Sequence, residues 1–369
     1  MSEPTQSTGQ PPATGAYAAA GVDIEAADKA VDLMKSWVAK TDRPEVIGTL
    51  GGFAGLYDAS ALTRYRQPIL ATSTDGAGTK VAVAQAMDVH DTIGFDLVGM
   101  VVDDLVVCGA EPLFMTDYIA CGRVVPERIA AIVKGIAEAC VEAGCALVGG
   151  ETAEHPGLME PDAYDVAGAA TGVVEAADLL GPGRVRPGDV VVAMGSSGLH
   201  SNGYSLVRHV LLDSADAGGA GWQLDREVPE LGRRLGEELL EPTRIYTRAC
   251  LALAESTGVH AMAHVTGGGL AANLARVLPR EVSVTVDRAT WTPPPVFDVV
   301  RRVGRLSQDD VEATLNCGIG MVALVPAEDV DQAIETLAGH GVPAWPAGEV
   351  TLDDQHGGQV RLAGQHPGW

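Results

Sequence analysis

The chain has 369 residues, of which 46% are hydrophobic, and a formal net charge of −24 at pH 7. This length is typical of two domains, each large enough to bury a core of its own. The negative charge would repel a nucleic acid at long range, so nucleic acid is excluded as a partner. A phosphate ligand would have to be held by local cations, Mg²⁺ or backbone N–H groups.

Six cysteines lie at positions 108, 121, 140, 145, 250 and 317, and none forms a CxxC pair. Scattered cysteines are typical of a reducing compartment, and no metal-thiolate site is expected. The N-terminus lacks a charged region followed by an apolar core, and no apolar run approaches the roughly twenty residues of a membrane helix. We therefore expect a soluble, cytoplasmic protein with no membrane partner.

Residues 1–16 (MSEPTQSTGQPPATGA) are polar and rich in proline, which predicts a disordered tail. Helix and strand patterns then alternate over residues 17–178, as in an α/β domain. Helices are predicted at 26–40, 91–108 and 126–143, the last with Pro126 in its first turn and Gly144 after its end. Strands are predicted at 68–72, 113–121, 146–149 and 164–174.

A turn-rich connector, GPGRVRPGD at residues 181–189, opens a second α/β domain over residues 179–350. Its strands are predicted at 190–194, 319–325 and near 344, and its helices near 205 and at 243–255 and 327–338. Residues 351–369 are polar and glycine-rich and are expected to be a C-terminal tail. The predicted fold class is therefore α/β with two domains.

The stretch STDGAGTK, Ser73 to Lys80, places an acid, two glycines, a hydroxyl and a lysine directly after an apolar strand. Asp75 would emerge at the carboxyl end of that strand, where α/β sheets usually bind ligands. Gly76 and Gly78 would let backbone N–H groups approach an anion, while Lys80 neutralises a phosphate and Asp75 holds Mg²⁺. The order differs from the usual phosphate loop, so the stretch is as consistent with a glycine-rich turn and a surface lysine.

The predicted helix at 91–108 carries an acid on its apolar face. Leu97, Val101, Asp104 and Cys108 are spaced by four, three and four residues, so Asp104 lies within the apolar stripe. Because a buried carboxylate needs a cation or donors, Asp104 is predicted to share Mg²⁺ with Asp75; an acid exposed at the helix end is the alternative. Asp103 is predicted to face the surface.

Three further polar clusters follow predicted strands: GGETAE at 149–154, SSGLHSNG at 196–203 and HVTGGG at 264–269. Glu151 in the first is a possible metal or hydroxyl ligand, although a turn capped by Thr152 explains it nearly as well. In the other two, hydroxyls, an amide and glycine N–H groups precede a helix and form a plausible phosphate cradle. Ordinary N-capping explains part of the second cluster, but not His200; His200 and His264 are candidates for anion binding or proton transfer.

These motifs together resemble one family. STDGAGTK, IGFDLVGMVVDDLVVCGAEPLF (93–114), ALVGGETAE (146–154), YDVAGAATGVV (164–174), SSGLHSNGYSLVR (196–208) and HVTGGGL (264–270) are similar to phosphoribosylformylglycinamidine cyclo-ligases, also called aminoimidazole ribonucleotide synthetases. The opening YAAAGVDIEAADKAV from Tyr17 agrees as well. The resemblance covers about residues 17–348, and the motifs follow the family order.

The resemblance implies a homodimer whose N-terminal mixed sheets pair across the interface, with a C-terminal α/β sandwich domain and with ATP and Mg²⁺ bound. It implies catalytic roles for His200, His264 and Lys80 and metal ligation by Asp75 and Asp104. The nucleotide would contact Gly51, Gly52, Ser73, Asp75, Gly76, Gly78, Thr79, Lys80, Asp104, Gly267, Gly268 and Gly269. The ribonucleotide would contact Glu151, Ser197, His200, Ser201 and Asn202.

The implied reaction is ATP-dependent ring closure of formylglycinamidine ribonucleotide to aminoimidazole ribonucleotide, with release of ADP and phosphate. Phosphorylating the formamide oxygen would turn it into a leaving group for intramolecular attack by nitrogen. A nucleotide-binding regulator with an inactive site is the alternative. The chain departs from the usual family pattern at Asp103, Leu315 and Cys317, where asparagine, phenylalanine and methionine are common; Asp103 adds negative charge beside Asp104.

Overall fold

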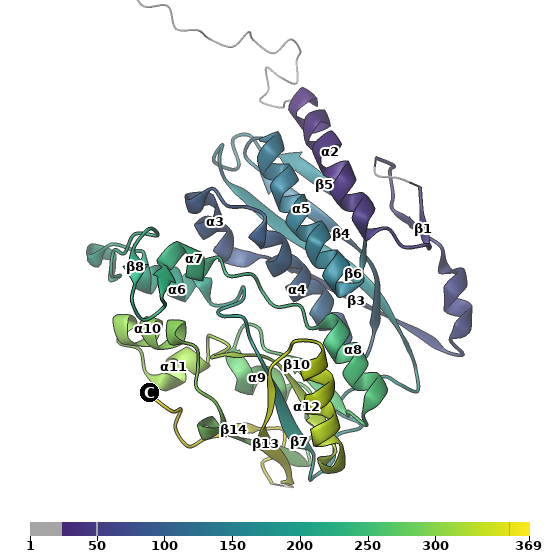
Figure 1. Ribbon diagram of the computed structural model, residues 1–369, viewed down its shortest axis with the longest axis vertical. Coiled ribbons are helices and arrows are strands. Elements are labelled where there is room, and N and C mark those ends of the chain that lie inside the picture. The colour runs from purple at the N-terminus through teal and green to yellow at the C-terminus, as the bar shows by residue number, and fades with distance from the viewer. Residues whose placement is uncertain (1–23, 49–50, 354) are drawn as a thin grey trace, which may run out of the picture.

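The computed structural model of the protein describes residues 24–48, 51–353 and 355–369 (Figure 1). The tail predicted at residues 1–16 lies outside the described residues. Two sheets dominate the fold, one built from residues 68–175 and the other from residues 190–363. The predicted α/β class with two domains is confirmed.

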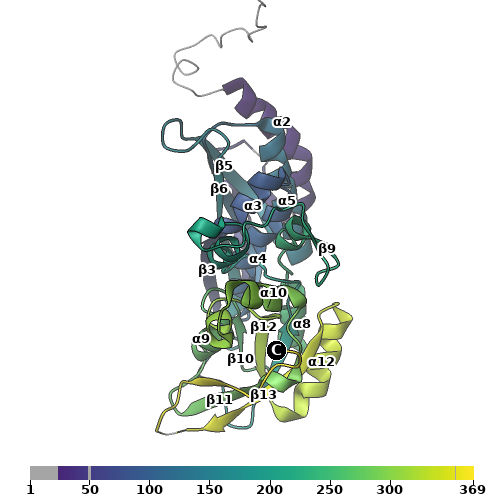
Figure 2. The same cartoon turned by 90° about the vertical axis from the view of Figure 1, so that its left-hand side faces the viewer.

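The first sheet has four strands in the order β3 (Pro68–Gly76), β6 (Tyr164–Glu175), β4 (Glu111–Cys121) and β5 (Ala146–Glu154). β6 is antiparallel to β3 and β4, and β4 is parallel to β5, so the sheet is mixed as predicted. Helices α2 (Ile24–Val38), α4 (Thr92–Val106) and α5 (Pro126–Ala143) lie on one side of it (Figure 2). β3 extends four residues beyond the predicted strand, which places Asp75 next to its last residue.

Helix α5 has the ends predicted from the sequence. Pro126 occupies its first turn, and Gly144 ends it in the left-handed conformation with φ 75°. α5 packs closely on α4 because both helices present a glycine at the crossing. A Cβ on Gly135 would lie 1.8 Å from the Asp91 carbonyl oxygen, and one on Gly94 would lie 2.0 Å from the Ile136 nitrogen. The glycines therefore set the position of α4, the helix that carries the candidate site acids.

The second sheet has six strands in the order β10 (Ala261–His264), β12 (Ile319–Val325), β7 (Val190–Gly195), β13 (Ala344–Leu352), β11 (Val282–Asp287) and β14 (Val360–Ala363). Both faces are buried, since alternate residues of β7 enter different cores: Val191 and Ala193 one, Val192 and Met194 the other. α8 (Thr247–Ser256) and α12 (Val330–Gly339) belong to the second core, and α9 (Gly269–Ala275) to the first. The predicted α/β sandwich is confirmed.

The expectation of a C-terminal tail at residues 351–369 is wrong. β13 continues to Leu352, and β14 pairs in parallel with β11, matching Val284 to Val360 and Val286 to Leu362. His366 is buried. The sequence pattern did not predict this strand because β14 has only four residues, too few for an alternating pattern to stand out.

The remaining elements surround these sheets. The short helices are α3 (Val81–Met87), α6 (Tyr204–Leu211), α7 (Leu235–Leu239), α10 (Pro295–Gly304) and α11 (Gln308–Glu312). Two small hairpins pair β1 (Val46–Ile47) with β2 (Leu56–Tyr57) and β8 (Glu227–Val228) with β9 (Arg233–Arg234). Single 3₁₀ turns occur at Ala39–Thr41, Ala59–Arg64, Gly78–Lys80, Ala215–Ala217, Arg288–Thr290 and Ala327–Asp329. Within the described chain, no helix is both long enough and apolar enough to cross a membrane.

Candidate active site at the domain junction

Three of the four predicted polar clusters meet where the two domains touch. The Ser201 hydroxyl of the second domain donates a 2.6 Å hydrogen bond to the Ala77 carbonyl of the first, and the Thr79 and Ser205 hydroxyls lie 3.2 Å apart. A Cβ on Gly267 would lie 3.5 Å from Asn202 Oδ1, so the HVTGGG loop lies against SSGLHSNG. The chain therefore brings STDGAGTK, SSGLHSNG and HVTGGG together, although they are far apart in sequence.

Lys80 is a completely buried clamp between the domains. Its ammonium donates to Asp96 Oδ1 at 2.7 Å, to the His200 carbonyl at 3.0 Å and to the Glu241 carbonyl at 2.6 Å. Asp96 lies on α4, and its Oδ1 also accepts hydrogen bonds from the backbone N–H and hydroxyl of Thr243. One ion pair of the first domain thus binds two backbone segments of the second, at residue 200 and at residues 241–243.

This geometry assigns Lys80 to the domain junction and leaves no free N–H on it for a phosphate. Both sequence interpretations, a phosphate ligand and a surface lysine, overlooked the acid sixteen residues ahead. Burial lowers the pKa of Lys80 and raises the pKa of Asp96, while their contact opposes both changes. We regard the pair as ionised, because the ammonium has all three of its hydrogen bonds and Asp96 Oδ1 accepts three.

The prediction for the two neighbouring acids of α4 is reversed in the structure. Asp103, expected at the surface, is fully buried, whereas the side chain of Asp104 is 39% exposed. The helical stripe failed as a guide because α4 is covered by the first sheet, by α5 and, near its C-terminal end, by α8. Asp103 accepts hydrogen bonds from the Tyr246 N–H at 3.0 Å and the Thr247 hydroxyl at 2.8 Å, at the start of α8. Burial nevertheless raises the pKa of Asp103 to about 6.

His264 and Asp104 form a pair across the junction. His264 Nδ1 lies 3.0 Å from Asp104 Oδ1, and the imidazole is almost completely buried at the end of β10. Since a carboxylate only accepts, Nδ1 carries a proton, and in the neutral form of the ring Nε2 presents a lone pair. Nε2 is buried and has no hydrogen-bond partner among the described residues. A histidine oriented by an acid, with its other nitrogen free, is the usual arrangement of a general base.

His200 has a different environment. It adopts a left-handed backbone conformation with φ 60°, and its Nε2 accepts a 3.2 Å hydrogen bond from the Ser197 N–H. The ring packs near Tyr246 and against Gly320, where a Cβ would lie 2.5 Å from the imidazole. Burial, then the proximity of His264 and Lys80, lowers the pKa of His200 well below its usual value. His200 is therefore neutral and holds the SSGLHSNG loop, while His264 is the better placed of the two for proton transfer.

Asp75 is exposed at the end of β3, where its Oδ1 accepts the Gly76 N–H. Through the register of β3 and β6 it lies opposite Gly168, which in turn lies opposite Asp117 on β4. Residues directly opposite in antiparallel strands share a face, so Asp75 and Asp117 lie at one level on the helix-covered face of the sheet. Only a glycine separates them.

Asp117 is the site residue that our sequence reading missed. Burial raises its pKa to about 7, and its Oδ1 would lie 2.2 Å from a Cβ on Gly150. Its signal was present: Met115 and Ile119 flank it at a spacing of two, which places its carboxyl on the inward face of the strand.

Asp117 borders a cavity of about 580 Å³ that also contains Gly51, Gly52 and Glu151. The apolar lining comes largely from α2, α5 and β5, through Ala30, Val31, Met34, Val38, Val133 and Leu147. Glu151 itself is exposed. The fourth predicted cluster therefore lines this cavity together with the predicted nucleotide loop, and the contacts that join the other three clusters do not include it.

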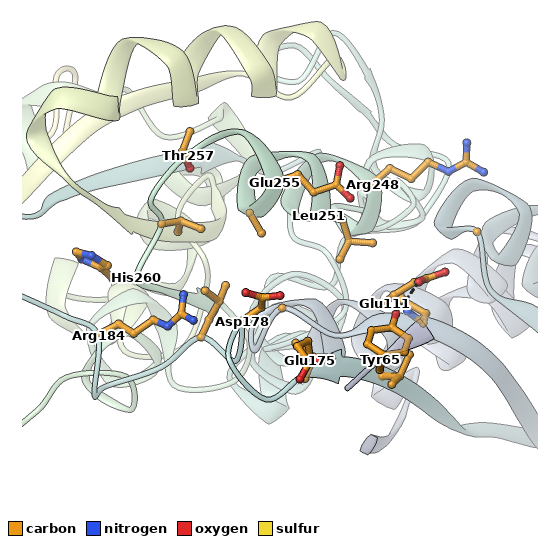
Figure 3. Close-up of a pocket in the computed structure, with 18 of the residues that line it drawn as sticks. Tyr65, Glu111, Glu175, Asp178, Arg184, Arg248, Leu251, Glu255, Thr257 and His260 are labelled. Atoms are coloured by element: carbon orange, nitrogen blue, oxygen red, sulfur yellow. Dashed lines mark hydrogen bonds between the residues drawn. The ribbon is translucent and has the colours of Figure 1, made fainter. Parts of the chain in front are cut away.

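A second cavity, of about 1160 Å³, lies between the domains (Figure 3). Its lining mixes arginines with acids, among them Arg184, Arg248, Glu175, Asp178 and Glu255. No residue predicted to be functional lines it. Because its charges are of both signs, its chemistry is not that of a phosphate site, and the larger cavity is not the candidate active site.

Comparison with known proteins identifies the family of the chain. The family models for AIR synthase related proteins match at residues 57–174, for the N-terminal domain, and 186–361, for the C-terminal domain. A phosphoribosylformylglycinamidine cyclo-ligase from Geobacillus kaustophilus is 51% identical over 91% of this chain and 95% of its own. The chain belongs to this family. A cyclo-ligase from Shouchella clausii is 49% identical over 92% of the chain and 96% of its own length.

Solved structures with lower sequence identity than these relatives share the fold of the chain. Thiamine-monophosphate kinase from Stenotrophomonas maltophilia superposes with a TM-score of 0.66 and 21% identity, covering 91% of this chain and 96% of its own. The hydrogenase maturation protein HypE in complex with ATP gives a TM-score of 0.61 with 19% identity, covering 88% of each chain.

The Lys80 clamp makes a stability prediction. Replacing Lys80 by methionine leaves Asp96 buried without its cation, so we expect the free energy of unfolding to fall by roughly 3–5 kcal/mol. Lys35→Met is the matched control, because Lys35 pairs with Asp32 on the exposed face of α2 and should contribute less than about 1 kcal/mol. Urea unfolding of the three proteins measures both changes. Equal stability of Lys80→Met and Lys35→Met would contradict the clamp.

Proposed function

We propose that this protein catalyses the ATP-dependent ring closure of formylglycinamidine ribonucleotide to 5-aminoimidazole ribonucleotide, a step of purine biosynthesis. The main support is the cyclo-ligase relationship, at 51% identity over 91% of the chain. The junction supports it independently, since it joins an oriented histidine, an exposed aspartate and glycine-rich helix entries in one place. The enzyme would be cytoplasmic, in keeping with six cysteines that are all free thiols.

We place the adenine of ATP in the 580 Å³ cavity behind the Gly51–Gly55 loop. Its apolar walls suit the faces of the ring, and the Asp117 carboxyl can pair with the polar edge of the base. Two strand spacings, roughly 10 Å, separate Asp117 from Asp75 along the sheet. That span lets the phosphates of a nucleotide bound in the cavity reach Asp75 and the glycines after it.

Asp75 and Asp104 would hold Mg²⁺. Among the described residues, no group of three histidines, cysteines or acids could bind a metal by itself. Two carboxylates fit Mg²⁺ nonetheless, because this ion usually keeps waters and takes its remaining ligands from substrate phosphates. Asp104 is half-exposed, and only its Oδ1 is used by His264 in the contacts described above. When bound, the ion would neutralise charge on the transferring phosphoryl group.

The residues of the chain would act on the substrate from the second domain. The N–H groups around Gly267 and Gly268 would contact the nucleotide, while the Asn202 amide, the Ser197 hydroxyl and the backbone of Ser201 would hold the ribonucleotide. His264 Nε2 would accept the proton released when nitrogen attacks the phosphorylated formamide carbon, while Asp104 stabilises the resulting imidazolium. The side chain of Ser201 is already used to hold Ala77, so its backbone is its freer group.

The catalytic proposal is tested by ADP release with and without formylglycinamidine ribonucleotide, following the imidazole product. We expect ADP and the imidazole to form in equal amounts, and only when the ribonucleotide is present. ATP binding without substrate-dependent hydrolysis would instead indicate a nucleotide-binding regulator.

The proton-transfer role predicts a large loss of turnover for His264→Ala, on the order of 10²–10⁴-fold in kcat, as for other general bases. His209→Ala is the control, since His209 is half-exposed on α6, where it pairs with Asp213. Steady-state kinetics on both variants, with circular dichroism to verify folding, decides the point. Unchanged kcat and KM in His264→Ala would remove the residue from the mechanism.

We further propose a homodimer formed through the uncovered face of the first sheet. Leu70 on β3 is 60% exposed and Tyr118 on β4 is 42% exposed, and Thr72, Ala167 and Ala169 on the same face are exposed too. The helices lie on the other side (Figure 2). An open sheet face with apolar side chains is typical of an interface between chains.

Leu70→Glu should therefore shift the protein from dimer to monomer, because it would place two carboxylates in a symmetric interface. Leu352→Glu is the control, an equally exposed leucine on the second domain. Sedimentation velocity at several concentrations measures both. A wild-type protein that sediments as a monomer, or a Leu70→Glu dimer as tight as the wild type, would refute this interface.

A further inference from the structure

The last ten residues of the chain contact a segment that packs against both glycine-rich loops of the second domain, SSGLHSNG and HVTGGG. This bracing segment, residues 312–318, lies directly on Gly269 and Gly203. A Cβ on Gly269 would lie 1.8 Å from the Glu312 carbonyl oxygen, and one on Gly203 would lie 2.3 Å from the Leu315 side chain. Asn316 Nδ2 donates a 2.9 Å hydrogen bond to the Gly198 carbonyl. Any displacement of the segment must therefore move HVTGGG and SSGLHSNG together.

His366 binds the beginning of the bracing segment. Its Nε2 lies 2.8 Å from Glu312 Oε1, and its side chain is fully buried. Arg288 holds the same carboxylate through Nε at 2.8 Å and Nη2 at 2.6 Å, and its Nη1 donates to the Leu362 carbonyl of β14 at 2.7 Å. These bonds lower the pKa of Glu312 to about 2 despite its burial, so the carboxylate is ionised at any physiological pH.

His366 also supports the end of the bracing segment, by packing against Trp291. Its ring packs edge-on against Trp291, with the centroids 4.5 Å apart, and Trp291 Nε1 donates to the Cys317 carbonyl at 2.9 Å. The ring of Trp369 also packs edge-on against the imidazole, with the centroids 4.8 Å apart. The histidine thus contacts two tryptophans, and through Glu312 and Trp291 it contacts both anchors of the segment.

We propose that His366 is a positioning residue, and that the C-terminal segment 360–369 acts as a latch that holds the two glycine-rich loops in their binding conformation. The family model ends at residue 361, so the final residues of the latch lie beyond it. Figure 1 shows the C-terminus beside α11, the helix that ends at Glu312. The link to catalysis rests on the proposed function; the link to loop order does not.

The experiment compares full-length wild type, His366→Leu, His366→Gln and His340→Leu by hydrogen–deuterium exchange. His366→Leu keeps apolar volume but loses the bond to Glu312, whereas glutamine retains an N–H donor. His340 is exposed at the end of α12, so His340→Leu is the matched control. We expect His366→Leu to speed amide exchange in residues 197–203 and 266–270 by at least about tenfold, with α5 unchanged and with partial restoration by glutamine.

Steady-state kinetics on the same proteins gives an independent measure. A latch that orders binding loops predicts a KM for the ribonucleotide raised about tenfold in His366→Leu, with kcat within about twofold. Unchanged exchange in both loops, or equal acceleration in α5, would overturn the latch. Wild type without substrate-dependent ADP release would refute the proposed function and leave the exchange result valid, so the two failures are distinguishable.

Discussion

The candidate active site at the domain junction depends on one helix of the first domain, α4, whose acids are bound by the second domain. α4 belongs to the first domain, yet Asp96, Asp103 and Asp104 contact Thr243, the start of α8, and His264. Asp96 and Asp103 are fully buried, and taking two carboxylates out of water is costly unless each finds donors. The second domain supplies those donors, so the helix is stable in this position only when the domains are docked.

This dependence links domain docking to chemistry. The orientation of His264 comes from Asp104, which belongs to the other domain, and the loop that presents His200 and Ser201 is fixed by Lys80 and by the Ala77 carbonyl. Neither domain contains the histidine–acid pair alone. A displacement of one domain against the other at the junction would lengthen the 3.0 Å contact between Nδ1 and Oδ1 and remove the acceptor that orients the His264 ring.

The sequence predicted the two-domain α/β fold and most regular elements, because long helices and strands carry strong periodic patterns and clear caps such as Pro126 and Gly144. It predicted the polar clusters that meet at the junction for the same reason: glycines and acids directly after apolar strands stand out. The sequence did not predict which polar side chains are buried, because contacts between distant segments determine their burial. Asp103 and Asp104 are adjacent, and only the position of α8 determines which is buried. Lys80 is a clamp because Asp96 lies beneath it, and His366 is buried because a four-residue strand brings it to Glu312.

Because the ammonium of Lys80 binds groups within the protein, a chain of charge −24 must bind two phosphorylated substrates by other groups. Among the residues predicted to contact them, Lys80 was the one with a permanent positive charge, and its ammonium is used by Asp96 and two carbonyls. In the proposed mechanism, phosphate would be bound by the backbone N–H groups around the glycines, together with a metal held by Asp75 and Asp104. Two carboxylates without such a metal would repel the phosphates of ATP, whereas with it they attract them. In our proposal the nucleotide therefore binds as its Mg²⁺ complex, and the acids that look unfavourable for an anion are the reason the site selects the metal-bound form.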